Sequence, residues 1–197
     1  MSKLLILFLT FGVGSASAQT IDDLFPYVVP ESYFEIFPAA KKFSKELGNE
    51  ISIALIFNFG ESVKNVSKAD LNRLKISEDQ AHATAIENLA KLAASQAVKM
   101  RQIQGPEGKP FLLFGGHWAA ATCILLPHLH SSLSKRFESE EVCVSIPHRD
   151  ALLAFPRGNS TYLAEMKKMI KDKERWGERR LTDELFVLTK EGIKELE

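Results

Sequence analysis

The stretch that decides the fold runs over residues 77–114 and reads SEDQAHATAIENLAKLAASQAVKMRQIQGPEGKPFLLF. Ser77 with Gln80 three residues later forms a capping box, which marks the start of a helix. From residue 81 to residue 93, alanine, isoleucine and leucine recur at helical spacing and predict one broad apolar face. The sequence GPEG at 105–108 separates two apolar segments, as the turn of a hairpin does. The stretch therefore predicts a helix followed by two antiparallel strands.

Working outward from this stretch, the chain continues to alternate between predicted helices and strands. Strands are expected at 51–59 (with one buried face), 142–146, 151–155 and 185–188, and a last hairpin around Gly192. Further helices are expected at 38–47, 67–74, 117–137 with a kink at Pro127, and 160–176. Residues 19–50 form a lead-in that prolines break into pieces. Because hairpins separate the helices, we expect an α+β fold: a two-layer domain with a largely antiparallel sheet and three main helices.

Composition excludes several classes of protein. The 197 residues are 45% hydrophobic, which is too apolar for an intrinsically disordered chain. The 25 basic residues equal the 25 acidic ones, and a chain without excess positive charge is not expected to bind nucleic acid. Two cysteines are too few for a disulfide scaffold or for a zinc site built from cysteines alone.

The first 18 residues have the three parts of a secretory signal peptide. Lys3 supplies the positive charge, an apolar run follows, and Ser15 to Ala18 end in small residues. The apolar run is shorter than the roughly 20 residues that span a bilayer. We therefore expect cleavage between Ala18 and Gln19, export to the periplasm or the medium, and no integral membrane segment afterwards. Residues 19–197 are expected to form a single domain.

The densest polar group in the sequence is Pro147, His148, Arg149 and Asp150. A histidine, an arginine and a carboxylate on one turn could act as base, anion clamp and orienting group, with Glu87 facing them. The alternative is structural, because proline and aspartate are also what a turn between two strands requires. We favour the structural interpretation and keep His148, Arg149, Asp150 and Glu87 as weak catalytic candidates.

The histidines and cysteines predict no metal or cofactor. His128 and His130 lie two residues apart, which would place them on different sides of a helix, and no two histidines have the HxxxH spacing. Cys123 and Cys143 leave two alternatives open. Export would permit a disulfide between them, whereas two buried free thiols would pack as small apolar side chains.

Several segments together resemble the YtpQ-like family, bacterial proteins that share a domain of unknown function. The similar segments are IALIF at 53–57, residues 63–71, AIENL at 85–89, Gly115 with Gly116, and VSIPHRDAL at 144–152. The resemblance implies a bacterial source and no established activity. Members tend to carry an acidic residue near Asn58 and another near 117–120, where this chain has none. Any site made by those acids would be lost here.

These observations lead to one main functional hypothesis and two alternatives. The main hypothesis is a non-catalytic binding or interaction domain whose ligand is a protein or a small molecule, because no nucleophile, metal or phosphate-loop motif is present. The first alternative is a hydrolase-type enzyme that uses the turn at 147–150. The second is an envelope-associated module that uses the charged residues 167–180.

Overall fold

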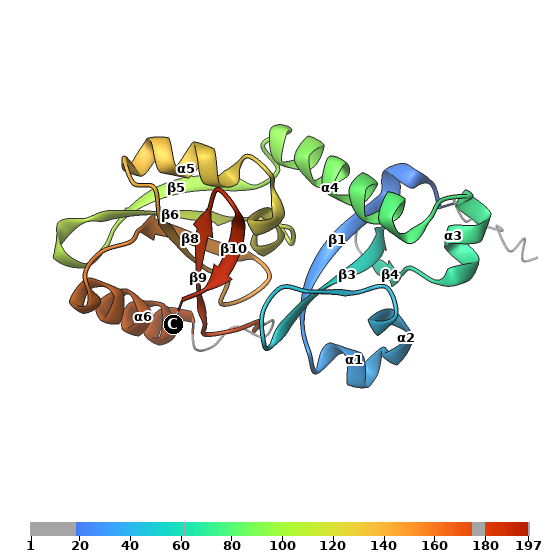
Figure 1. The fold of residues 1–197 in the computed structure, drawn as a ribbon, viewed down its shortest axis with the longest axis horizontal. Helices are drawn as coiled ribbons and strands as arrows, with labels where there is room; N and C mark the ends of the chain where they lie inside the picture. The colour runs from blue at the N-terminus through green and yellow to red at the C-terminus, as the bar shows by residue number, and fades with distance from the viewer. Residues whose placement is uncertain (1–18, 61, 175–179, 197) are drawn as a thin grey trace, which may run out of the picture.

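The computed structural model describes residues 19–60, 62–174 and 180–196. Helices and antiparallel sheets make up these ranges, which confirms the expected α+β class. The strands form two sheets, and Figure 1 shows them at opposite ends of the molecule. The expected leader at 1–18 lies outside the described residues, as does the expected helix end at 175 and 176.

The first sheet is built near the start of the described chain. Its strands are β1 (Leu24–Pro30), β2 (Lys45–Glu46), β3 (Ile51–Asn58) and β4 (Val63–Asn65). Around it lie the 3-10 turn η1 (Ile21–Asp23) and the helices α1 (Tyr33–Ile36), α2 (Pro38–Lys41), α3 (Lys68–Leu74) and α4 (Glu78–Ala94). Both predicted helix starts are confirmed, since the side chains of Ser67 and Ser77 cap α3 and α4.

Strand β1 was not predicted, because we expected its prolines to break residues 19–50 into pieces. It pairs with β3 along its whole length and lies at an edge of the sheet. An edge strand has one side without ladder hydrogen bonds, where a proline that lacks an N–H causes no loss. Pro26 and Pro30 are therefore compatible with a strand here.

Two further expectations for this region are wrong. The helix expected at 38–47 ends at Lys41, because Lys45 and Glu46 pair with β3 as strand β2. Strand β3 is buried on both faces, whereas its alternating pattern predicted one. Leu55 and Phe57 pack toward α3 and α4, and Ala54 and Ile56 pack against a second cluster that includes Phe34.

The second sheet has six strands in the order β10-β9-β7-β8-β6-β5. Its strands are β5 (Lys99–Gln104), β6 (Pro110–Gly115), β7 (Val142–Ser145), β8 (Ala151–Pro156), β9 (Leu185–Thr189) and β10 (Gly192–Glu195). The 3-10 turns η2 (Pro106–Gly108) and η3 (Ala121–Leu125) and the helices α5 (Leu129–Phe137) and α6 (Ser160–Glu174) complete this half. The predicted hairpins at 98–114, at 142–155 and around Gly192 are all confirmed.

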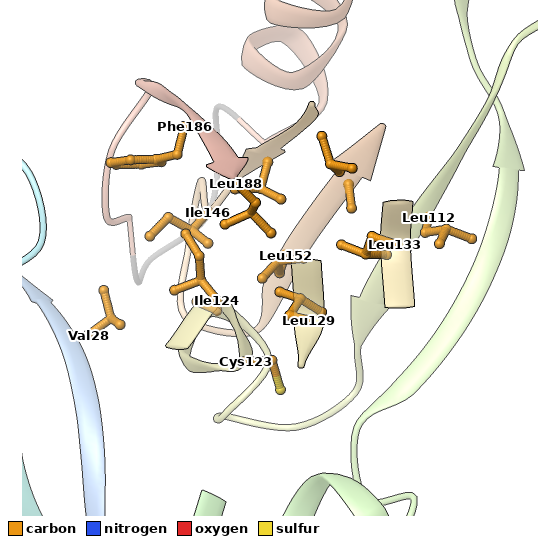
Figure 2. Packing of buried hydrophobic residues seen from close by; sticks show 14 of the residues in the cluster. Val28, Leu112, Cys123, Ile124, Leu129, Leu133, Ile146, Leu152, Phe186 and Leu188 are labelled. Atoms are coloured by element: carbon orange, nitrogen blue, oxygen red, sulfur yellow. The ribbon is translucent and has the colours of Figure 1, made fainter. Parts of the chain in front are cut away.

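Helices cover both faces of the second sheet, whereas a two-layer domain has them on one. On one face, Leu129 and Leu133 of α5 pack on Leu112 and Leu152, as Figure 2 shows. On the other face, the buried side chains of α6 (Tyr162, Met166 and Ile170) pack on the opposite sides of the same strands. This half of the molecule therefore has three layers.

The helix expected at 117–137 is divided into two separate elements. Residues 121–125 form η3, and α5 begins only at Leu129. Leu126 is extended, with φ −68° and ψ 124°. A proline ring disfavours helical backbone at the residue before it, so Pro127 ends the first segment instead of kinking one long helix.

The two sheets share packed side chains. Val28 of β1 and Ile51 of β3 belong to the same core cluster as Val144 and Ile146 of the second half. Helix α4 packs on β1 and leads directly into the second sheet. We call this contact between the two sheets the joint between the halves of the molecule. Because α4, η3 and the turn at 147–150 all lie near it, the joint positions the candidate sites.

Candidate functional site

The turn at 147–150 is held in place by backbone hydrogen bonds. The N–H of Ala151 donates to the carbonyl of His148 at 3.1 Å, which closes the turn between β7 and β8. The N–H of Ala121 in η3 donates to the carbonyl of Arg149 at 3.0 Å, and that of Leu181 donates to Pro147 at 2.8 Å. Three separated segments therefore meet at this turn.

Two of the four weak candidates come together. His148 and Asp150, both half-buried, line one small pocket of about 200 Å³ together with Lys99 and Arg101 of β5. The described residues that line it include no serine, threonine or cysteine. The pocket therefore offers an acid, a base and two cations, without the nucleophile that covalent hydrolysis needs.

Arg149 points to the first sheet. Its Nη1 donates to the hydroxyl of Tyr27 at 2.7 Å, and its Cζ lies 4.7 Å from the centre of that ring and 5.9 Å from that of Tyr33. Such cation–π contacts hold an arginine against aromatic rings. The tyrosines come from β1 and α1, so Arg149 joins the two halves of the molecule and is absent from the small pocket.

Glu87 is also separate from this pocket. It is exposed on α4 and is not among the residues that line the pocket. The neighbouring Asn88 is buried, and its Nδ2 donates to the carbonyl of Ile21 at 2.9 Å and to that of Leu24 at 3.0 Å. The hypothesis that Glu87 faces the turn is therefore wrong. The side-chain amide of the neighbouring Asn88 has a structural role, since it binds the backbone at the start of β1.

The cysteines are free thiols in the described structure. Cys123 and Cys143 belong to core clusters on opposite faces of the second sheet. Burial raises the pKa of each thiol to about 11. Both therefore stay protonated near neutral pH and pack as small apolar side chains, which resolves the two alternatives in favour of free thiols in this structure.

Histidines do not gather into a metal site within the described residues. His130 Nε2 lies 2.8 Å from the carbonyl of Glu140 and 2.9 Å from Ser134 Oγ. His117 lies close enough to Asp150 for the two to interact; burial lowers the pKa of His117, and the carboxylate acts in the opposite direction. These contacts are local and involve one histidine each.

A second hollow, larger than the small pocket at the 147–150 turn, was not predicted from the sequence. We call it the apolar groove; its main lining residues are Ala90 and Ala93 of α4, Met100 and Phe114 of the hairpin, and Leu129 and Leu133 of α5. Its volume of about 560 Å³ falls within the range of small-molecule sites. Its remaining lining includes His128, Lys135 and Arg136 and, among the described residues, no carboxylate.

Sequence reasoning could have found parts of this groove but not the whole. Met100 is one of two apolar residues in a strand whose other four residues are polar, and it is 48% exposed. That pattern is a local signal of an exposed apolar site. The groove itself exists because α4, β5 and α5 come together. The spacing of residues along the chain does not predict that these three elements are neighbours.

The described residues contain no helix that is both long and apolar enough to cross a bilayer. Comparisons of the chain with protein-family models, with curated proteins and with solved structures find no match, and the resemblance to the YtpQ-like family therefore stays a prediction.

Proposed function

We propose that this chain is an exported, non-catalytic binding domain that holds an apolar group in the apolar groove. The observation that carries the proposal is the groove itself: a hollow of about 560 Å³ with mainly apolar walls and an exposed Met100. Binding sites are typically concave and apolar, with a few polar groups that orient the ligand. Export rests on the signal-peptide pattern of residues 1–18.

Charge at the groove favours an anionic group next to the apolar one. Lys135 and Arg136 lie at the last turn of α5, and His128 precedes that helix. Arg136 donates from Nη2 to the neutral side chain of Gln102 at 3.1 Å, and it forms no ion pair with a carboxylate of the described residues. The expected ligand is therefore apolar with a carboxylate, sulfonate or acidic side chain nearby.

The test is binding of 1-anilinonaphthalene-8-sulfonate, an apolar and anionic dye, followed by its fluorescence. Ala93→Phe places a ring in the groove and should weaken dye binding by about tenfold, which corresponds to about 1.4 kcal/mol. Ala94→Phe is the matched control, because Ala94 is exposed on the same helix and does not line the groove. Its dye binding should equal that of the unaltered protein.

Equal dye binding by both phenylalanine variants would contradict the proposal. Thermal unfolding followed by circular dichroism checks that each variant is folded. If Ala93→Phe disturbs the fold, Met100→Glu tests the same groove from a half-exposed position, where an added carboxylate should repel the anionic dye.

A hydrolase-type activity at the 147–150 turn is the second candidate. One observation favours it: His148 and Asp150 line the same small pocket. A hydrolase should cleave p-nitrophenyl acetate faster than free imidazole does, and His148→Ala should abolish that cleavage. A rate unchanged by His148→Ala would remove this candidate without affecting the binding proposal.

A further inference from the structure

Strand β5 is an open edge of the six-stranded sheet. It pairs with β6 on one side, and no strand in the described part of the chain pairs with its other side. Five of its six residues are exposed. At the opposite edge, the side-chain carboxylate of Glu195 in β10 accepts hydrogen bonds at 2.6 Å from the N–H and the Nδ2 of Asn49, which belongs to the first half. Of the two edge strands of this sheet, β5 is the longer, with six residues against four in β10.

The side chains of β5 alternate between two chemical environments. Met100 pairs with Phe114, and both line the apolar groove beside α5. Lys99 and Arg101 pair with Gly115 and Leu113 on the other face, where all four line the small pocket. Successive residues of a strand point to opposite faces, so one face offers an apolar hollow and the other two cations.

The ion pairs between described residues include neither Lys99 nor Arg101, although the carboxylate of Asp150 also lines the small pocket. Lysines on an edge strand can simply discourage unwanted pairing. Prevention of pairing does not, however, explain a half-exposed methionine that lines an apolar groove. Two cations on one face and an apolar groove on the other instead match an added strand that alternates acidic with apolar side chains.

We propose that β5 is the docking edge for an extended segment of a partner protein, which adds one strand to the sheet and alternates acidic with apolar side chains. Backbone hydrogen bonds to β5 supply affinity, as in other cases of strand addition. One apolar side chain enters the apolar groove, and the acidic side chains before and after it face Lys99 and Arg101. The inference rests on the proposed function, since it uses the same groove.

The test uses a fluorescein-labelled peptide of about eight residues that alternates glutamate with leucine, long enough to pair along all of β5. Fluorescence anisotropy measures its binding to the mature chain. We expect Arg101→Glu to weaken binding at least about tenfold. Lys168→Glu is the matched control: it makes the same charge change at an exposed residue of α6 and should leave binding unchanged.

Three further peptides separate strand addition from mere charge attraction. A peptide of the same composition with its glutamates and leucines in two blocks should bind at least about tenfold more weakly. So should a peptide methylated on those alternate backbone nitrogens whose N–H groups would face β5, because it cannot complete a ladder. A lysine–leucine peptide should not bind. Equal binding of the alternating, blocked and methylated peptides would overturn the inference.

The dye distinguishes this inference from the proposed function. If the dye binds in the groove and the alternating peptide does not, strand addition is wrong and the groove remains a ligand site. Dodecanoate, a single-chain amphiphile, then shows by dye displacement whether the occupant is a small molecule. If neither the dye nor the peptide binds, both proposals fail.

Discussion

Replacing Asn88 by alanine is expected to lower the free energy of unfolding by about 2 to 3 kcal/mol, because two buried hydrogen bonds are lost and the carbonyl of Ile21 keeps only the N–H of Leu24 as a donor. The buried Asn88 side chain donates to Ile21 at 2.9 Å and to Leu24 at 3.0 Å. These bonds attach α4 to the start of β1. Urea unfolding followed by circular dichroism measures the loss.

Glu87 provides the control for this experiment. It precedes Asn88 on the same helix but is exposed, so Glu87→Ala should change the free energy of unfolding by less than about 0.5 kcal/mol. An Asn88→Ala variant as stable as Glu87→Ala would show that the two amide hydrogen bonds contribute nothing.

Acidification from pH 7 to pH 5 is expected to cost about 2 kcal/mol of stability through His82 alone. Burial, reinforced by Lys45, lowers the pKa of His82 from 6.5 to about 4. The unfolded chain therefore takes up a proton near pH 6.5, while the folded chain does so only near pH 4. Stability is fully present above pH 6.5 and is lost as the pH falls between these values.

The comparison that isolates this effect uses His82→Phe, which keeps a ring in the core but cannot titrate. Urea unfolding at pH 7 and pH 5 gives the loss on acidification for each protein. The unaltered protein should lose about 2 kcal/mol more than His82→Phe. Equal losses in the two proteins would mean that folding leaves the pKa of His82 unchanged, which contradicts the prediction.

His82 also shows where reasoning from sequence stopped. The helix was predicted from its capping box, and the burial of Ala81, Ala85 and Leu89 follows its apolar face. His82, next to Ala81, is 8% exposed because α4 turns that side toward the segment that contains Phe43. A polar residue beside an apolar stripe gives no sign of such burial until the neighbouring segment is placed.

The 147–150 turn also combines features that the sequence predicted with features that it did not predict. Its position between two strands was predicted correctly from proline, aspartate and the flanking apolar residues. The directions of its side chains were not: His148 lines the small pocket, while Arg149 contacts Tyr27 across the joint between the halves. Tyr27 lies in β1, a strand that we did not predict because its segment contains prolines. The residues around Arg149 therefore gave no indication that Arg149 contacts Tyr27.

By itself, the sequence determined the α+β class, the starting positions of α3 and α4, and the hairpins of the second sheet. Each depends on residues close together in the chain, where capping side chains, turn residues and apolar periodicity act on the local backbone. Only the tertiary structure decided that there are two sheets, that Glu87 lies apart from the turn, and that an apolar groove opens beside β5. These features depend on packing between segments that are far apart in the chain. The free energy of that packing comes from burying apolar surface between elements, and the spacing of residues within one element does not predict which elements meet.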